Sequence, residues 1–443
     1  MDPQKVAYAV IARLEEEGYE AYLVGGCVRD MLMNRPVKDY DVATSALPEQ
    51  VIASFARTIP TGLKHGTITV VIQGTPVEVT TFRTESKYED HRRPASVTFV
   101  PNLREDLQRR DFTINAIAMD RNDRLIDPFE GRQDIGRKTI RCVGDAWERF
   151  EEDALRMLRC LRFASNYGFA IDDATWQALL AKAPLLRHIA MERVEAELTK
   201  MIAGADPLRA VRLLQRSGLL RHTKVPLGPL ADWLASQVNE AGGIPDSSVP
   251  GALCLLRWTE LSGEVMRWSL LFAAAGVNRD DAAYAMKGLV FSRRRSDRII
   301  KLLELDQAVA LMVYDLYNKG AAEVDMHSDP FKRLVLPFGK GCASDWLRLQ
   351  TLLLPDRDER LRGLYEAITD HGAGWLEEMP IWERTQLAVT GAEVAEAFSR
   401  EAGPWTAKVL DRLLADTALC KTANEKNKLL ELAEHYGKEL EMR

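Results

Sequence analysis

The stretch YLVGGCVRDMLMNRPVKDYDVAT, residues 22–44, places a glycine pair at a predicted strand-to-helix junction. A β-type run leads into Gly25 and Gly26, and a helical pattern follows them. Backbone N–H groups at such a junction are free to bind an anion, and the first turn of a helix favours negative charge. Arg29 lies on that first turn, where its guanidinium could reach a phosphate oxygen. The stretch therefore predicts a phosphate-binding turn, although an isolated glycine turn of this kind more often has only a structural role.

The same stretch ends in two aspartates, Asp39 and Asp41, separated by one residue. In a β-strand their side chains would share one face, roughly 7 Å apart, and such a pair could hold two metal ions about 3.5–4 Å apart. Isolated aspartates at this spacing are usually solvated turn residues. Beside a phosphate-binding turn they predict a Mg²⁺ site for nucleotidyl transfer, since the cation would relieve their mutual repulsion. Glu78, in the middle of a predicted strand, is a candidate third acid or else an ordinary exposed glutamate.

Composition indicates a folded protein of more than one domain. The chain has 443 residues, of which 46% are hydrophobic, enough for several cores. Its formal net charge of −6 gives no sign of a polyanionic partner, so any nucleic-acid contact depends on local basic patches. The six cysteines include no C-x-x-C pair, which argues against a zinc cage and a disulfide framework and favours the reducing cytoplasm. No apolar run is long enough to span a membrane, and the first helical segment is too charged for a secretory signal.

The periodicity of apolar residues changes once along the chain. Residues 3–18 predict an amphipathic helix, and short strand-like runs then alternate with helical pieces up to about residue 140. Beyond about residue 145 the helical period takes over. Breaks rich in Pro and Gly at 239–251 and 336–342 divide this helical part. The expected fold is thus an α/β unit followed by mainly helical domains.

A series of motifs resembles one known family. The motifs are LVGGCVRDMLM, DYDVATSALPEQV, PTGLKHGTITVV, RRDFTINAIAMD, IDPFEGRQDI, RFEEDALRMLRCLRFA and ERVEAELTKM. Together they span residues 22–201 and closely resemble the class II, bacterial-type tRNA nucleotidyltransferases, the CCA-adding enzyme family. A weaker similarity continues to residues 389–405. No single motif is specific, but the ordered series is.

The resemblance implies an architecture and a set of partners. The head, residues 1–142, would have the polymerase-β-like nucleotidyltransferase fold and carry the catalytic site. A helical neck (143–205) would recognise the nucleotide base, and a helical body (206–325) and tail (326–443) would bind tRNA. The implied activity is addition of CCA to the tRNA 3′ acceptor end from CTP and ATP, with Mg²⁺ as the metal.

The resemblance also assigns roles to single residues. Asp39 and Asp41 match the catalytic, metal-binding carboxylates, and Asp111 matches a ribose-recognising residue. The remaining matched residues would bind the nucleotide: Gly25 and Gly26 with Arg29 at the triphosphate, then Arg110, Asp153, Arg156, Arg159 and Arg162. A later motif with Glu192, Arg193 and Glu197 would support the neck helix.

The motif EEDALRMLRCLR suggests how bases are chosen. On a predicted helix Asp153 and Arg156 are i,i+3 neighbours, following Glu152. Cytosine and adenine both present an amino donor beside a ring-nitrogen acceptor, whereas uracil and guanine present a carbonyl beside an N–H. A carboxylate next to an arginine fits the first two and opposes the others. Without the surrounding motifs, an ordinary salt bridge between these residues is the better interpretation.

Several alternatives stay open. A charged loop at 83–96 has the full length that the family associates with switching from C to A addition, which disfavours a CC-adding enzyme. An A-only enzyme, a bacterial poly(A) polymerase and a catalytically inactive RNA-binding protein remain competitors. The basic cluster at 292–301 could bind RNA phosphates or be a solvated helix face. None of the seven histidines is followed by Asp, so no His-Asp phosphohydrolase activity is expected.

Overall fold

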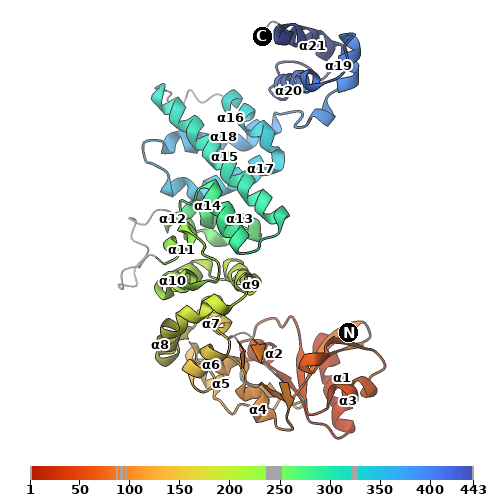
Figure 1. The fold of residues 1–443 in the computed structure, drawn as a ribbon, viewed down its shortest axis with the longest axis vertical. Helices are drawn as coiled ribbons and strands as arrows, with labels where there is room; N and C mark the ends of the chain where they lie inside the picture. The colour runs from red at the N-terminus through yellow and green to blue at the C-terminus, as the bar shows by residue number, and fades with distance from the viewer. Residues whose placement is uncertain are drawn as a thin grey trace. The chain divides into compact units, whose positions relative to one another are not determined.

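The computed structural model divides the chain into two compact units (Figure 1). The first unit comprises Met1–Asn239 with Gly288–Val290, and the second comprises Glu240–Lys287 with Phe291–Arg443. The structure describes residues 2–85, 88–89, 93–94, 97–235, 252–320 and 328–441. The first unit includes the predicted head and neck, and the second contains only helices in its described parts. The finer division at residues 142, 205 and 325 stays a prediction.

The head is built on a seven-stranded sheet with the order β11-β10-β1-β2-β5-β4-β3. Only the β2–β5 pair within it is parallel. The strands are β1 (Ala21–Val24), β2 (Asp41–Thr44), β3 (Thr58–Gly62), β4 (Thr67–Ile72), β5 (Thr75–Thr81), β10 (Ala118–Met119) and β11 (Leu125–Ile126). The helical elements are α1 (Pro3–Glu16), α2 (Gly26–Leu32), α3 (Pro48–Ser54), α4 (Leu103–Gln108), the 3₁₀ helix η2 (Thr113–Asn115) and α5 (Gly131–Arg137).

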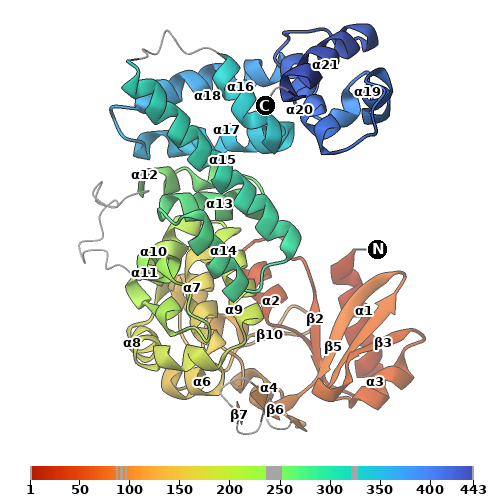
Figure 2. The same ribbon diagram turned by 45° about the horizontal axis from the view of Figure 1, so that its top comes forward.

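The sheet is covered on both faces at β1 and β2, where alternate strand residues point to opposite faces. Leu23 and Val42 belong to the core shared with α1 and α3, whereas Val24 and Ala43 join a second core with residues of α4. Figure 2 shows α1 and α3 beside the sheet. Helix α1 confirms the amphipathic helix expected at 3–18. The two cores hold β1 and β2 in a fixed place, with the glycine turn at the end of β1 and Asp41 at the start of β2.

The β4–β5 hairpin fixes the register of the third acid. Gln73 and Gly74 have φ values of 49° and 82°, as a two-residue hairpin turn requires, so the turn predicted at Gly74 is confirmed. The parallel pairing of β2 with β5 then sets Asp41 beside Glu78. Glu78 points away from its buried neighbours Val77 and Val79, as its place in the strand predicts.

The neck contains a helix break that the sequence does not predict. Helix α6 (Ala146–Glu152) ends at Asp153, which has φ −137° and ψ 101°, and α7 (Leu155–Tyr167) begins two residues later. The prediction that Asp153 and Arg156 share one continuous helix is therefore wrong. The backbone turns at Asp153 because its carboxylate accepts a hydrogen bond from Leu155 N at 3.1 Å and so caps the start of α7. The other elements of the first unit that follow α5 are β12 (Thr139–Ile140), β13 (Ala170–Ile171), α8 (Asp173–Lys182), α9 (Met191–Ile202), α10 (Pro207–Ser217) and α11 (Pro229–Trp233).

The predicted loop at 83–96 lies partly outside the described residues. Its described parts form two short antiparallel pairs. Strand β6 (Arg83–Glu85) pairs with β9 (Val97–Phe99), and β7 (Tyr88–Glu89) pairs with β8 (Arg93–Pro94). The described ends of this segment are therefore paired strands rather than irregular backbone.

The second unit is helical throughout its described residues, which agrees with the expected change of periodicity after residue 145. Its helices are α12 (Ala252–Leu255), α13 (Glu264–Ala274), α14 (Arg279–Gly288), α15 (Arg293–Asn318), α16 (Ser328–Val335), α17 (Lys340–Leu353), α18 (Arg362–Glu377), α19 (Gly391–Ala397), α20 (Pro404–Ala418) and α21 (Lys426–Glu441). The break predicted at 239–251 lies outside the described residues. The break at 336–342 is a 3₁₀ turn followed by Gly339 with φ 80°.

The basic cluster at 292–301 forms the first turns of α15, with Arg293 almost fully exposed. None of the helices in the described ranges has the length and apolar content needed to cross a membrane.

Candidate nucleotide-binding site

A pocket of about 570 Å³ in the first unit brings the predicted site residues together. The head contributes the glycine turn, Asp41 and the RRDFTIN segment, and the neck contributes Asp153, Arg156 and α7. The lining residues are Gly25, Gly26, Arg29, Asp41, His65, Arg83, Arg109, Arg110, Asp111, Asn115, Asp153, Leu155, Arg156, Arg159, Phe163 and Arg193. Asp41 therefore lies in the same pocket as the two residues predicted to read the base.

At Gly25 of the glycine turn, an added side chain would displace Arg110. Gly25 has φ 73° and ψ −125° and is the residue just before α2. A Cβ atom on Gly25 would lie 2.7 Å from Nη1 of Arg110 and so collide with it. Because the φ angle also favours glycine, this position allows Arg110 to lie directly against the backbone of the turn.

Arg29 is buried and held on several sides. Its Nη1 donates to Oδ1 of Asn115 at 2.6 Å, and its Nε donates to Oδ1 of Asp30 at 2.9 Å. Its guanidinium carbon lies 4.9 Å from the ring centroid of Tyr167 on α7, within cation–π range. A guanidinium has five N–H donors, so these contacts fix Arg29 while leaving donors for a phosphate.

The acids beside the glycine turn carry largely uncompensated negative charge. Burial raises the pKa of Asp41 to about 6, and the nearby carboxylates of Glu78 and Asp39 add to that effect while Arg110 opposes it. Asp39 itself is exposed, precedes β2 and is not among the pocket-lining residues. The expectation that Asp39 and Asp41 share one strand is therefore wrong, because the strand begins at Asp41. Within the part of the chain that the structure describes, no group of three or more His, Cys, Asp or Glu side chains is arranged to hold a metal ion.

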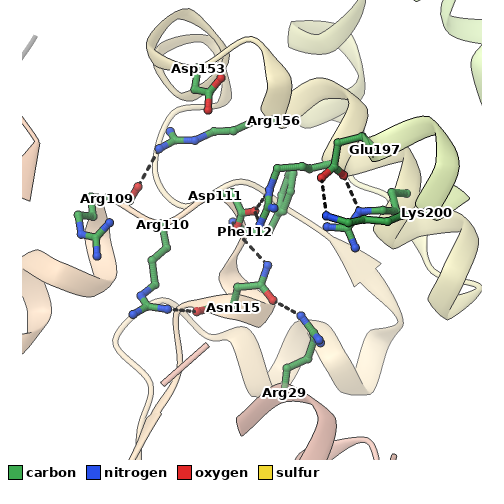
Figure 3. A network of polar contacts seen from close by, with 12 residues as sticks. Arg29, Arg109, Arg110, Asp111, Phe112, Asn115, Asp153, Arg156, Glu197 and Lys200 are labelled. Atoms are coloured by element: carbon green, nitrogen blue, oxygen red, sulfur yellow. Dashed lines mark hydrogen bonds and ion pairs between the residues drawn. The ribbon is translucent and has the colours of Figure 1, made fainter. Parts of the chain in front are cut away.

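Asp111 contrasts with these acids because its charge is fully paired. One oxygen accepts from Asn115 Nδ2 at 2.9 Å and from the backbone N of Phe112 at 2.8 Å. The other oxygen is 2.8 Å from Nε and 2.6 Å from Nη2 of Arg159; Figure 3 shows Asp111 beside Asn115. Burial alone would raise the pKa of Asp111, but Arg159 and the hydrogen bond from Asn115 outweigh it and lower the pKa to about 2.

The two predicted base-reading residues have separate anchors. Oδ2 of Asp153 lies 2.7 Å from Nη2 of Arg193, which α9 supplies. Nη1 of Arg156 lies 2.6 Å from Glu152 Oε2, and its Nη2 donates to the backbone O of Arg109 at 2.9 Å. The neck thus holds the Asp153 carboxylate and the Arg156 guanidinium in place at the wall of the pocket. The contact to Arg193 agrees with a supporting role for the ERVEAE motif.

Arg162 is placed differently from the other predicted nucleotide-binding residues. Its Nε lies 2.5 Å from Oε2 of Glu197, and its guanidinium carbon is 4.1 Å from the ring centroid of Phe163. It is not among the pocket-lining residues. The contact ties α7 to α9, so the structure gives Arg162 a helix-packing position.

Sequence reasoning missed Asn115 and Arg109. Asn115 bridges Arg29 and Asp111, and Arg109 pairs with the buried carboxylate of Asp106 at 2.9 Å. The available signal for Asn115 was its place in RRDFTIN, four residues after Asp111, where η2 brings its side chain back toward that carboxylate. Such a bridge needs the spatial position of Arg29, which lies 86 residues earlier in the chain.

Comparison with known proteins identifies the family. Family models match residues 21–141 ("Poly A polymerase head domain"), 168–224 ("Probable RNA and SrmB-binding site of polymerase A") and 364–433 ("tRNA nucleotidyltransferase domain 2 putative"). The chain is similar to the CCA-adding enzyme of Geobacillus thermodenitrificans, with 38% identity over 96% of each chain. It is 33% identical to that of Bacillus cereus, over 97% of this chain and 98% of the relative. The chain belongs to the CCA-adding enzyme family.

Solved structures of the CCA-adding family agree with this assignment. The crystal structure of the Bacillus stearothermophilus CCA-adding enzyme in complex with CTP matches with a TM-score of 0.78 and 34% identity. The match covers 100% of this chain and 99% of that one. The Thermotoga maritima CCA-adding enzyme complexed with tRNA matches with a TM-score of 0.62 at 18% identity, which supports the shared fold alone. The expected nucleotidyltransferase head and helical remainder are thereby confirmed.

Proposed function

We propose that this protein adds CCA to the 3′ end of tRNA, using CTP and ATP and releasing pyrophosphate, in the cytoplasm. One pocket is lined by Asp41 and the glycine turn together with Asp153 and Arg156, and this observation carries the proposal. An inactive RNA-binding protein would have no use for a buried acid with a raised pKa beside a phosphate-binding turn. The relatives named CCA-adding enzyme, which match over almost the whole chain, support the same reaction.

We infer that the reaction depends on a divalent metal, and that Mg²⁺ is held by Asp41 together with Asp39. The donor set fits a hard cation, since oxygen ligands suit Mg²⁺ and the raised pKa of Asp41 marks negative charge that the protein leaves largely unpaired. Glu78, aligned with Asp41 across the β2–β5 pair, adds to this negative field. When bound, Mg²⁺ would neutralise the triphosphate and favour attack of the tRNA 3′-hydroxyl on the α-phosphate.

The other residues of the pocket bind and orient the nucleotide. The backbone N–H groups of the glycine turn and the Arg29 guanidinium would bind the triphosphate. Arg110, packed against Gly25, would contact the same end of the nucleotide. Asp111 and Arg159 would define the ribose site. With the nucleotide held at these points, the α-phosphate would lie at the Asp41 side of the pocket.

Base selection would come from Asp153 and Arg156. The carboxylate would accept from the amino group of cytosine or adenine, and the guanidinium would donate to the adjacent ring nitrogen. Each matched edge should be worth about 1–3 kcal/mol of discrimination. Because Arg193 and Glu152 hold these two side chains, uracil and guanine would meet fixed groups of the wrong polarity.

Product sequencing tests this function directly. Purified protein receives tRNA transcripts that end before CCA, after C or after CC, with CTP and ATP together and separately. With both nucleotides present, we expect all three transcripts to end in CCA and to stop there. Growth only from the CC end would indicate an A-only enzyme, a stop after CC would indicate a CC-adding enzyme, and a long A tail would indicate a poly(A) polymerase.

A pair of variants tests the assignment of base selection. Arg156→Ala should raise incorporation of UMP and GMP relative to CMP and AMP by about tenfold, the lower part of the range for one lost edge contact. Arg156→Lys keeps the charge but loses the forked donor geometry, so it should relax selectivity to an intermediate degree. Unchanged selectivity in both variants would assign Arg156 a purely structural role.

A further inference from the structure

Asn115 occupies a buried position between two groups that bind different parts of the nucleotide in the proposed function. Its Oδ1 accepts from Nη1 of Arg29 at 2.6 Å, and its Nδ2 donates to Oδ1 of Asp111 at 2.9 Å (Figure 3). All three residues are buried, each with an exposed fraction of 7% or less. The series of polar contacts continues from Asp111 to Arg159 on α7. It therefore runs from the triphosphate side of the pocket to the neck helix.

The primary amide is well suited to this position. It has an acceptor oxygen for a cation and a donor nitrogen for an anion on the same rigid plane. A carboxylate there would still accept from Arg29 but would place a second negative oxygen against Asp111. An alanine would leave both partners with one contact fewer, and buried charged groups lose the most from a missing partner.

The backbone of Asn115 provides a third contact. Its carbonyl oxygen accepts from Nη1 of Arg110 at 3.4 Å, and the same Nη1 lies against Gly25. The 3₁₀ helix that carries Asn115 is anchored elsewhere by Thr113, whose Oγ1 donates to Asp134 at 2.6 Å. One residue thus touches Arg29, Arg110 and Asp111, the groups assigned to the triphosphate and the ribose.

We propose that Asn115 is a positioning residue that couples triphosphate binding to ribose recognition, so that the pocket selects a ribonucleoside triphosphate as one unit. The inference rests on the proposed function, because that function assigns Arg29 to the triphosphate and Asp111 to the ribose. A triphosphate that fixes Arg29 also fixes the amide, and the amide fixes the carboxylate that meets the 2′-hydroxyl. By linkage the effect is reciprocal, so a ribose that fixes Asp111 strengthens triphosphate binding equally.

Equilibrium dialysis of the full chain with Mg²⁺ tests the coupling. The dissociation constants of CTP, dCTP and CMP give two ratios for each protein. The dissociation constant of dCTP divided by that of CTP measures the contribution of the 2′-hydroxyl, and the dissociation constant of CMP divided by that of CTP measures the contribution of the two outer phosphates. Asn115→Ala should reduce both ratios about tenfold, the loss expected for one hydrogen bond to a charged group.

Two further variants separate positioning from general damage. Asn115→Asp keeps the acceptor for Arg29 but repels Asp111, so it should lower the 2′-hydroxyl ratio more than the phosphate ratio, which loses only the coupling. Thr113→Ala removes a buried hydrogen bond from the same 3₁₀ helix without touching Arg29 or Asp111, so it should destabilise the protein and leave both ratios unchanged.

The inference fails if Asn115→Ala binds all three nucleotides more weakly by one common factor, or if wild-type protein binds CTP, dCTP and CMP alike. It also fails if Thr113→Ala changes the ratios as much as Asn115→Ala does. The proposed function fails separately, if wild-type protein shows the expected ratios but adds no CMP or AMP to a tRNA lacking CCA.

Discussion

The two acidic regions of the pocket, one beside the glycine turn and one beside α7, have opposite electrostatic character. Asp41 has few cationic neighbours, and its pKa is raised to about 6 by burial and by Glu78. Asp111 is more deeply buried than Asp41 but is paired with Arg159, and its pKa is lowered to about 2. Two aspartates of one pocket therefore have pKa values shifted in opposite directions.

The difference indicates which acid would gain most from a cation supplied from outside the protein. Asp111 already has its counter-charge, so its position and ionisation are settled by the fold. Asp41 is destabilised in its charged form, and a bound cation would remove that penalty. The paired acid fits a structural and nucleotide-positioning role, whereas the unpaired acid fits metal binding.

The largest expected effect comes from removing the unpaired charge. Asp41→Asn should reduce nucleotide incorporation at least about a thousandfold, the upper range for losing one electrostatic contribution to a transition state. The same variant should unfold at a higher temperature than wild type in EDTA at neutral pH, because it removes a buried charge. Incorporation assays and thermal denaturation measure the two effects. Glu49→Gln, which neutralises an exposed acid in the first turn of α3, should change neither substantially.

Removing the paired charge should instead destabilise the fold. Asp111→Ala leaves the Arg159 guanidinium without its carboxylate, and we expect the free energy of unfolding to fall by about 2–3 kcal/mol. Urea denaturation of the full chain gives the shift. The double variant Asp111→Ala/Arg159→Ala should lose less free energy of unfolding than the two single variants lose together. Additive losses would mean that the pair contributes no coupling and that the contrast with Asp41 is overstated.

The pH dependence of stability should also differ between the two acids. The folded-state pKa of Asp41 is about 6, above the unfolded value, so its unfavourable contribution grows as pH rises through about 4 to 6. The advantage of Asp41→Asn in EDTA should therefore be absent near about pH 4 and complete above about pH 6. Asp111, with its lowered pKa, contributes stability at neutral pH that is lost only as pH falls below about 4. Melting temperatures across this pH range, with and without Mg²⁺, measure the contributions of both acids to stability. If Asp41→Asn were more stable than wild type by the same amount at every pH, the raised pKa of Asp41 would be contradicted.

The smallest expected effect concerns Arg162, which sequence resemblance assigned to the nucleotide. Because it pairs with Glu197 and is not among the pocket-lining residues, Arg162→Gln should lower stability without a measurable change in the dissociation constant of CTP. Arg159→Gln, one turn earlier and in contact with Asp111, should weaken CTP binding. Equilibrium dialysis measures the affinity of both variants for CTP. Equal losses of affinity would show that Arg162 contributes to nucleotide binding.

Local patterns in the sequence predicted much of the head. The amphipathic pattern of residues 3–18 predicted α1, the turn at Gly74 predicted a hairpin, and the glycine pair predicted a strand-to-helix junction at Gly25. These features depend on residues close together in the chain, and the structure has all three. The motif series also predicted that Asp41, Asp153 and Arg156 belong to one site, and the structure brings them to one pocket.

Two errors arose where a side chain or a neighbouring strand decided the backbone. Residues 146–167 contain no Gly or Pro, so periodicity gave no reason to end a helix at Asp153, but the carboxylate of that residue caps α7. Asp39 lies outside β2 because the β1–β2 and β2–β5 pairings include no residue before Asp41. The role of Asn115 could not be predicted, since it depends on the folded position of Arg29.

Binding of Mn²⁺, a spectroscopic substitute for Mg²⁺ at carboxylate sites, tests the contrast most directly. Electron paramagnetic resonance of the full chain with CTP measures the free ion during a titration of wild type, Asp41→Asn and Asp111→Asn. We predict that wild type and Asp111→Asn bind Mn²⁺ with similar affinity and that Asp41→Asn loses this binding. Retained binding in Asp41→Asn, or its loss in Asp111→Asn alone, would contradict the assignment of the metal to the unpaired acid.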